Sequence, residues 1–185
     1  MRETESVNNN SNPVLGVVLG SDSDLTVMLS GLELLEEWAI PFEVRILSAH
    51  RTPDAAQDYG KSAAKRGLKV LIAAAGMAAH LPGVLASYTM LPVIGVPIAS
   101  GHLQGNDALY AMVQMPPGIP VATVGINAGK NAALLAVQLL SLAYPIYQKK
   151  LKDFRDSQCQ TVISKDAELA RLGFRCYNVA HKEIP

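Results

Sequence analysis

The sequence predicts an α/β fold of three layers, in which helices cover both faces of a five-stranded parallel sheet. Short apolar runs alternate along the 185 residues with segments of helical spacing, the pattern of repeated βαβ units. Glycine and small polar residues follow several of these runs, as expected where a strand ends and a helix begins. Aromatic residues make up only 5% of the chain, which favours close packing of helices on a sheet.

The first two strand–helix units follow directly from this alternation. Residues 14–19 are a continuous apolar run, typical of a strand that is buried on both faces. A polar segment, 20–24, separates this run from a helical pattern over residues 25–38. Residues 42–47 begin with alternating apolar and polar side chains and predict the second strand, which precedes a helix over residues 54–66.

The next two units are shorter. Residues 70–75 predict the third strand, and small residues lead from it into a short helix over residues 79–88. Residues 93–96 predict the fourth strand, which a loop connects to a helix over residues 105–114. Right-handed crossovers should bring these strands into one parallel sheet.

The last unit completes the sheet. Residues 114–120 contain too many prolines for regular structure and precede a fifth strand over residues 121–126. A long helix is expected to start near Lys130 and to run past Tyr144, with a kink or break at Pro145. The strand order that this pattern favours is flavodoxin-like.

Nothing in the sequence marks a second folded domain. We expect a polar, disordered lead-in over residues 1–12 and a single catalytic α/β domain over residues 13–156. Residues 157–185 form a C-terminal extension of unassigned role with one weak helical stretch, 165–172. This extension either packs on a neighbouring subunit or is partly disordered.

Composition argues against several classes of protein. The formal net charge is zero, so there is no electrostatic case for binding nucleic acid or an anionic membrane. No apolar run is long enough for a membrane helix, and the start of the sequence lacks the apolar stretch of a secretion signal. Cys159 and Cys176 show neither metal-ligand spacing nor a disulfide-rich pattern. We therefore expect a cytoplasmic protein without a bound metal.

The most informative segment is residues 48–53, where His50 and Arg51 lie side by side between a strand and a helix. Thr52 and Pro53 are a helix-start signal, so the pair belongs to a turn at the carboxyl edge of the sheet. Ligands of α/β folds bind at this edge. Histidine can exchange protons near neutral pH, and arginine can hold a phosphate or carboxylate. The alternative is that Arg51 pairs with a surface carboxylate and His50 caps a backbone group.

A second candidate segment follows the first strand. Backbone N–H groups at a helix start form a natural anion site, to which Ser21 and Ser23 add hydroxyl donors. Asp24 should repel a phosphate but can bind ribose hydroxyls. The alternative is a helix cap alone. The segment is neither a Walker motif nor a dinucleotide fingerprint.

A third candidate segment follows the third strand. The run of Gly76, Met77 and Ala78 lets a flat ligand approach the backbone. His80 is a second candidate proton carrier, or else a structural histidine in a short apolar helix. A loop over residues 100–105 is placed to act as a lid or a subunit contact, although His102 in it is equally consistent with simple exposure.

Polar or ionisable residues thus follow three strands at one sheet edge. Together they indicate a phosphorylated small molecule with a flat group, on which proton transfer is performed. A non-catalytic flavodoxin-like module is the alternative from another class. Aromatic side chains for stacking on a flavin are missing from the predicted loops, and no acidic cluster with a lysine matches a receiver. A scaffold without a ligand would leave the three polar segments unexplained.

Several motifs resemble the N5-carboxyaminoimidazole ribonucleotide mutase family. These are the small catalytic subunits of the phosphoribosylaminoimidazole carboxylase family, which acts in de novo purine synthesis. The resemblance covers roughly residues 14–151 and rests on motifs at residues 20–24, 48–53, 78–83, 92–97, 113–116, 118–123 and 131–136.

The resemblance implies a three-layer α/β domain that assembles as a homo-octamer with active sites near subunit contacts. It implies transfer of a carboxylate from the exocyclic N5 to C4 of the aminoimidazole ring of a ribonucleotide, without a metal or organic cofactor. By position, His50 matches the general acid/base, and Ser21, Asp24 and Arg51 match substrate contacts. The remaining expected substrate-binding residues are Ser23, Ser48, Gly76, Met77, Ala78 and His80.

The sequence departs from the family pattern at some positions. Met77 stands where many relatives have glycine, and residues 100–104 differ from the commonest family sequence. The closest rival activity is an aminoimidazole ribonucleotide carboxylase that uses free carbon dioxide. Arg51 after His50 looks more like the mutase class, because the carboxylase class often has lysine after the histidine.

Overall fold

The sheet has the topology that the sequence predicts. The computed structural model describes residues 12–180, so residues 1–11 of the expected lead-in lie outside the described part. All strand pairs are parallel and their order is β2-β1-β3-β4-β5, which confirms the flavodoxin-like arrangement. The strands are β1 (Leu15–Leu19), β2 (Phe42–Ile46), β3 (Val70–Gly76), β4 (Val93–Ile98) and β5 (Ala122–Thr123).

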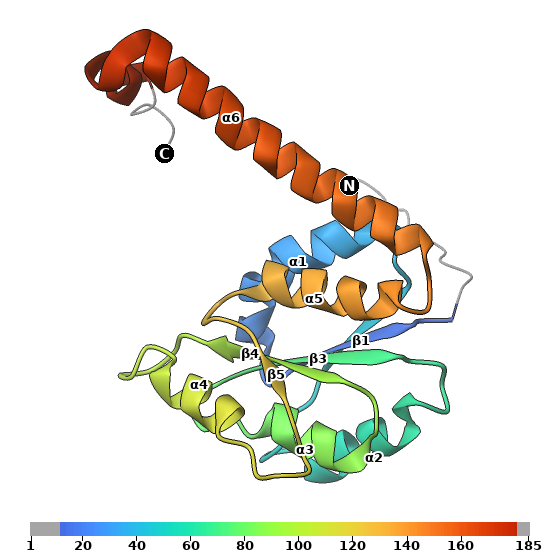
Figure 1. Cartoon of the computed structure of the whole chain (residues 1–185). Helices are drawn as coiled ribbons and strands as arrows, with labels where there is room; N and C mark the ends of the chain where they lie inside the picture. The colour runs from blue at the N-terminus through green and yellow to red at the C-terminus, as the bar shows by residue number, and fades with distance from the viewer. Residues whose placement is uncertain (1–11, 181–185) are drawn as a thin grey trace, which may run out of the picture. The chain divides into compact units, whose positions relative to one another are not determined.

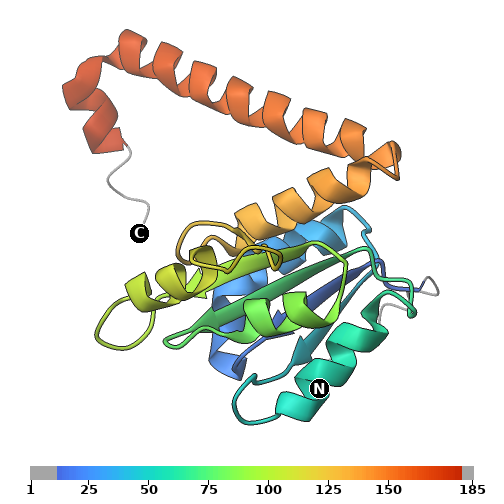
Figure 2. The same ribbon diagram turned by 60° about the horizontal axis from the view of Figure 1, so that its bottom comes forward.

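Helices form a layer on each face of the sheet (Figure 1). On one face α1 (Leu25–Glu37) packs against α5 (Gly129–Ser141). The opposite face carries α2 (Pro53–Ala63), α3 (Leu81–Tyr88) and α4 (Asn106–Val113), which Figure 2 brings forward. These three layers confirm the predicted architecture.

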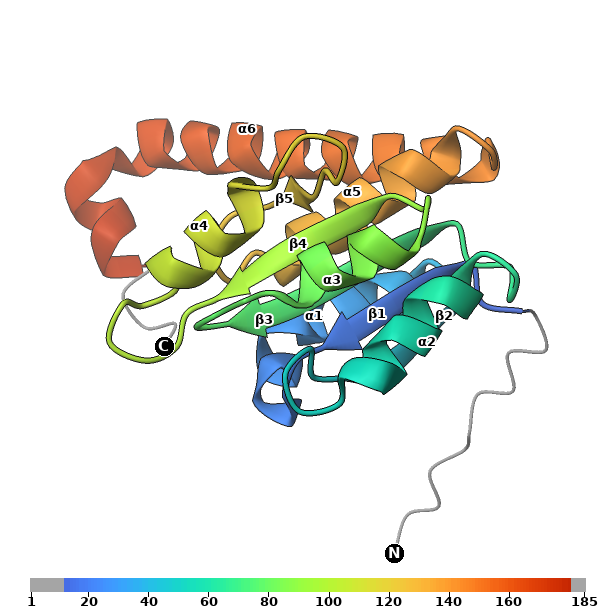
Figure 3. The same cartoon turned by 90° about the horizontal axis from the view of Figure 1, so that it is seen from below.

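The central strands explain the apolar runs in the sequence. Every residue of β1 and β4 is buried, and so is every residue of β3 except Gly76. Leu19 at the end of β1 pairs with Ile46 of β2 and Ala74 of β3. The segments that follow these strands, and that after β4, therefore start at one edge of the sheet, as the view from below shows (Figure 3).

Two elements differ from the prediction near the end of the domain. The fifth strand spans only Ala122–Thr123, because the chain turns soon after Val124 donates its N–H to the Gly95 carbonyl. Asn127 then adopts a left-handed φ of 57°, which a continuing strand cannot contain. The helix expected to run past Tyr144 ends at Ser141 instead, and the next helix starts after Pro145. The break expected at Pro145 is present.

The C-terminal part is far more helical than its sequence pattern indicates. Helix α6 spans Ile146–Ala180, 35 residues with a kink at Gly173, and contains the weak stretch expected over residues 165–172. Ion pairs four residues apart, Lys149 with Asp153 and Lys152 with Asp156, support its first turns. Backbone contacts divide the chain into one unit that ends at Ala143 and a second from Tyr144. The domain boundary expected after residue 156 lies inside α6.

None of the helices within residues 12–180 combines the length and the apolar character needed to cross a membrane.

Candidate functional site

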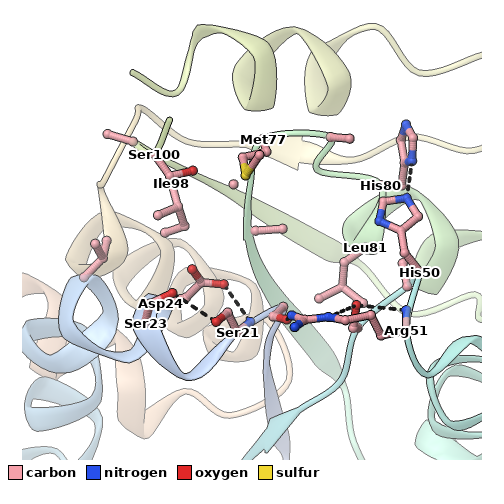
Figure 4. A pocket seen from close by; sticks show the side chains of 18 residues that line it. Ser21, Ser23, Asp24, His50, Arg51, Met77, His80, Leu81, Ile98 and Ser100 are labelled. Carbon is pink, nitrogen blue, oxygen red and sulfur yellow. Dashed lines mark hydrogen bonds between the residues drawn. The ribbon is translucent and has the colours of Figure 1, made fainter. Parts of the chain in front are cut away.

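The segments after β1, β2, β3 and β4 enclose a pocket of about 710 Å³ at the carboxyl edge of the sheet (Figure 4). Every residue that the sequence assigns to the site lines this pocket. They are Ser21, Ser23, Asp24, Ser48, His50, Arg51, Gly76, Met77, Ala78 and His80. The common edge explains this grouping, since parallel strands point all of their carboxyl ends in the same direction.

The segment after β1 is a network of short hydrogen bonds. The Ser21 N–H donates to the Asp24 carboxylate at 3.0 Å, and the Ser21 hydroxyl donates to Asp22 at 2.9 Å. The Ser23 hydroxyl donates to the Ser21 hydroxyl oxygen at 3.0 Å. Asp24 therefore acts in part as the helix cap that the sequence offered as an alternative. Ser21 and Ser23 also line the pocket.

Asp24 is a buried carboxylate, with 5% of its surface exposed. Burial raises its pKa, because the charged form loses hydration, and hydrogen bonds from the Ser21 and Gly20 backbone only partly offset this rise. Neighbouring Asp22 is exposed, and the hydrogen bond from the Ser21 hydroxyl lowers its pKa. Asp24 is thus the partly desolvated acceptor of this segment, as a binder of sugar hydroxyls should be.

The turn over residues 48–53 fixes Arg51 from several sides. The Ser48 N–H donates to the Thr52 hydroxyl at 2.9 Å, and the Thr52 hydroxyl donates to the Ser48 carbonyl at 3.1 Å. The Arg51 N–H and Nε donate to the Ser48 hydroxyl at 3.1 and 3.4 Å. Arg51 Nη2 donates to the Gly20 carbonyl at 3.4 Å, which places the guanidinium beside the segment after β1.

The charge of Arg51 remains available to a ligand. Its hydrogen-bond partners are the neutral oxygens of Ser48 and Gly20, and in the described part of the chain no carboxylate lies within ion-pair distance of it. Arg51 thus forms no direct ion pair in this part of the chain, but the exposed Asp22 carboxylate attracts its charge at longer range. A free guanidinium beside helix-start N–H groups is a suitable anchor for a phosphate.

His50 and His80 contact each other directly. Their Nε2 and Nδ1 atoms are 2.8 Å apart, and the rings meet edge to face with centroids 4.9 Å apart. One ring must donate and the other accept, so each histidine fixes the tautomer of the other. Figure 4 shows this pair on one side of Arg51, with Ser21 and Asp24 on the other side. The sequence identified both histidines but not their hydrogen bond.

Met77 adopts a left-handed φ of 55° and leaves 60% of its surface exposed. Glycine reaches this conformation at lower cost than methionine, which gives a physical reason for the glycine that many relatives have where this chain has Met77. The strain falls at the third pocket segment, where backbone outliers often accompany function.

Eight of the 18 pocket residues were not selected from the sequence, and three of these, Ile98, Ala99 and Ser100, come from one end of β4. Ile98 ends β4 and Ala99 and Ser100 follow it, and of the three only Ser100 falls in the loop expected as a lid or subunit contact. The sequence pattern could have identified Ser100, because it is a polar residue that follows an apolar strand at the same sheet edge. His102 of that loop does not line the pocket. Among residues 12–180, no three His, Cys, Asp or Glu side chains gather as metal ligands.

Comparison with known proteins agrees with the geometry. The family model described as AIR carboxylase matches residues 14–161. The chain is 53% identical over 165 residues to the N5-carboxyaminoimidazole ribonucleotide mutase of Synechocystis sp., covering 89% of this chain and 94% of the relative. It is 49% identical to the phosphoribosylaminoimidazole carboxylase of Candida glabrata, with 89% of this chain but only 29% of that relative covered.

A solved structure shares the fold. Treponema denticola PurE superposes with a TM-score of 0.76 and 30% sequence identity, covering 85% of this chain and 98% of that chain. The family match extends over most of the described chain, and it includes all four segments that enclose the pocket. The chain belongs to the AIR carboxylase family.

Proposed function

We propose that the chain is an N5-carboxyaminoimidazole ribonucleotide mutase, an isomerase of de novo purine biosynthesis. The observation that carries the proposal is the pocket in which His50, hydrogen-bonded to His80, lies beside the guanidinium of Arg51. The 53% identity to a mutase of nearly the same length supports this activity. We also expect a cytoplasmic protein, from the sequence and from the place of this reaction in metabolism.

Binding starts from the phosphate. Arg51 would hold the 5′-phosphate, and the Ser21 hydroxyl and the helix-start N–H groups would join it by giving up their hydrogen bonds to Asp22 and Asp24. Asp24 would accept hydrogen bonds from the ribose hydroxyls. With these groups anchored, the flat imidazole would lie along the Gly76, Met77 and Ala78 backbone.

The chemistry then needs one proton to be delivered and one to be removed. Protonation of the carbamate nitrogen by His50 breaks its bond to the carboxylate and releases carbon dioxide. Carbon dioxide, kept in the pocket, adds to C4, and the C4 proton leaves to His50. The histidine therefore ends in its starting state, and no net proton is consumed. Acid–base catalysis of this kind typically contributes about 10²–10⁴-fold, and positioning must supply the rest.

His80 has a supporting role in this scheme. Its hydrogen bond holds the His50 ring in one orientation and one tautomer, so that the proton is presented from a defined nitrogen.

The alternative activity is carboxylation of aminoimidazole ribonucleotide by free carbon dioxide. The deciding assay offers the purified protein the carbamate ribonucleotide in one reaction, and the aminoimidazole ribonucleotide with bicarbonate in another. The mutase should act on the first at low bicarbonate. Turnover of the second pair alone would replace the mutase by the carboxylase, and inactivity with both would refute the proposed function.

We further infer a homo-octamer, which the family resemblance implies. In such an assembly the active sites would lie near subunit contacts, and the exposed rim residue Met77 would lie close to one.

A further inference from the structure

Ser100 lies in the pocket next to the backbone of Gly76. Gly76 is the last residue of β3 and pairs with Ile98 of β4. A Cβ atom placed on Gly76 would lie 2.3 Å from the Ser100 hydroxyl oxygen and 3.2 Å from the Ile98 carbonyl oxygen. The hydroxyl therefore occupies the space that a side chain at position 76 would need. This contact brings Ser100 to the surface along which we propose that the flat ring lies.

Asn127 holds the chain immediately before Ser100. Its side-chain oxygen accepts the Ala99 N–H at 2.8 Å, and its own N–H donates to the Pro97 carbonyl at 2.8 Å. These two bonds clamp the end of β4 to the turn that precedes α5. The left-handed φ of Asn127, 57°, suits asparagine better than most residues, since its short side chain bonds locally.

The hydroxyl of Ser100 is available to a ligand. In the described part of the chain no residue forms a hydrogen bond with it, although its side chain is only half-exposed in the pocket. A partly buried hydroxyl normally finds a partner. In Figure 4, Ser100 lies on the opposite side of the pocket from Arg51, away from the proposed phosphate anchor.

We infer that Ser100 contacts the substrate, with its hydroxyl bound to a polar group of the ring, either the exocyclic amine or the carboxylate. Asn127 is a positioning residue that acts through Ser100. The inference rests on the proposed function, because it takes the position of the ring from the phosphate anchor at Arg51. A hydroxyl can both donate and accept, so it can bind the amine before transfer and the carboxylate after it.

Ligand binding tests the contact without relying on turnover. Calorimetry would compare 5-aminoimidazole ribonucleotide with ribose 5-phosphate on the wild type and on Ser100→Ala. We expect about a 10-fold loss of affinity for the ribonucleotide, as for one hydrogen bond to a ligand, and no loss for ribose 5-phosphate. The matched control is Ser87→Ala, because Ser87 is exposed on α3 and bonds only the Val84 carbonyl. Equal losses for both ligands, or none, would refute the ring contact.

A double-mutant cycle tests Asn127. Asn127→Gly keeps a residue that tolerates positive φ but removes the oxygen bound by Ala99, whereas Asn127→Asp keeps an acceptor. We expect about a 10-fold fall in kcat/KM for Asn127→Gly and recovery in Asn127→Asp. In the Ser100→Ala background, Asn127→Gly should have little further effect, because both changes remove the same contact.

The outcomes separate this inference from the proposed function. Full additivity of Ser100→Ala and Asn127→Gly, or a lower melting temperature of Asn127→Gly with unchanged kcat/KM, would show that Asn127 has only a structural role. If the wild type is active and Ser100→Ala binds the ribonucleotide as tightly as Ser87→Ala does, the contact of Ser100 with the substrate is refuted and the mutase activity is not. A wild type that turns over neither substrate would refute the mutase, and the two-ligand comparison would still decide whether Ser100 contacts a ring.

Discussion

His50 is the residue on which the proposed chemistry depends most, because in the proposed scheme it delivers one proton and removes the other. Replacing it with asparagine keeps a polar side chain but removes the ring nitrogens that can take up and release a proton near neutral pH. We expect His50→Asn to lower kcat by about 10²–10⁴-fold while folding and ribonucleotide binding remain largely intact. Steady-state kinetics and calorimetry would measure the two effects. A variant with a near-normal rate would remove His50 from its assigned role.

Arg51 should act in binding and not in proton transfer. Among residues 12–180 its guanidinium donates hydrogen bonds to the neutral oxygens of Ser48 and Gly20 and forms no ion pair, so we expect its charge to meet the phosphate. We expect Arg51→Ala to raise KM by about 10–100-fold, the usual range for a hydrogen bond to a charged group, with a smaller change in kcat. Arg51→Lys should recover part of the affinity, because it keeps the charge but not the planar fork. An unchanged KM in Arg51→Ala would contradict the phosphate assignment.

Asp24 predicts a specific dependence of stability on pH. Burial raises its pKa in the folded state, so the folded state binds more protons than the unfolded state between the ordinary and the raised pKa. By linkage, the contribution of Asp24 to the free energy of unfolding falls as pH rises through this window. Asp24→Asn removes the titration and still offers an oxygen to the Ser21 N–H.

Urea unfolding of the wild type and Asp24→Asn from pH 3 to pH 7 measures this effect. The free energy of unfolding of the wild type minus that of the variant should decrease as pH increases. A difference that is constant, or that grows with pH, would show that hydrogen bonds and not burial dominate at Asp24. A loss of stability at a carboxylate that we propose binds the ribose would be the usual trade between stability and activity.

At the scale of elements, the contact between α1 and α5 depends on two glycines. A Cβ atom on Gly31 would lie 2.7 Å from the Gly129 carbonyl oxygen, and one on Gly129 would lie 2.5 Å from the Val27 carbonyl oxygen. The two helices therefore approach each other as closely as their backbones permit. This accounts for part of the abundance of small residues in the sequence.

Helix propensity and packing make opposite predictions for Gly31→Ala. Propensity alone would stabilise α1 by about 1 kcal/mol, whereas the clash with a backbone oxygen forces the helices apart. We expect net destabilisation of about 1–3 kcal/mol, the usual cost of overpacking. Denaturant unfolding would be compared with Gly125→Ala, where the added Cβ would meet only the Ala128 side chain at 3.7 Å. A more stable Gly31→Ala protein would show that the helices are not held by this contact.

At the scale of the whole molecule, the exposed apolar surface indicates association. Ile46 of β2 leaves 57% of its surface exposed, and Val162 and Phe174 of α6 leave 66% and 72% exposed. Exposed apolar side chains mark sites of association where they join into a contiguous patch. The homo-octamer that the family resemblance implies would provide such cover.

Sedimentation equilibrium of the full chain tests the assembly directly. We expect a single species of about eight times the mass of one chain, which persists on dilution. Replacing Val162 and Phe174 together by serine should shift the distribution toward smaller species if α6 takes part in subunit contacts. A stable monomer with full turnover would contradict both the octamer and the need for neighbouring subunits at the site.

The sequence, with the family resemblance it carries, determined the order of elements and ten of the residues that line the pocket. Continuous apolar runs are unambiguous for strands buried on both faces, and polar segments after such strands must meet at one sheet edge. This is why Ser21, His50 and Gly76, which are far apart in the chain, could be assigned to one pocket before the structure was known. Local patterns are reliable here because each concerns a single strand–helix unit.

Only the tertiary structure decided how these residues meet. Three contacts join segments that follow different strands: the hydrogen bond between His50 and His80, that from Arg51 to Gly20, and the contact of Ser100 with Gly76. No local sequence pattern predicts such distances. The length of α6 was also missed, because its charged, weakly periodic sequence resembles a solvated linker. Sequence spacing reports which face or edge a residue belongs to, whereas the atoms it touches depend on how the strands and helices pack.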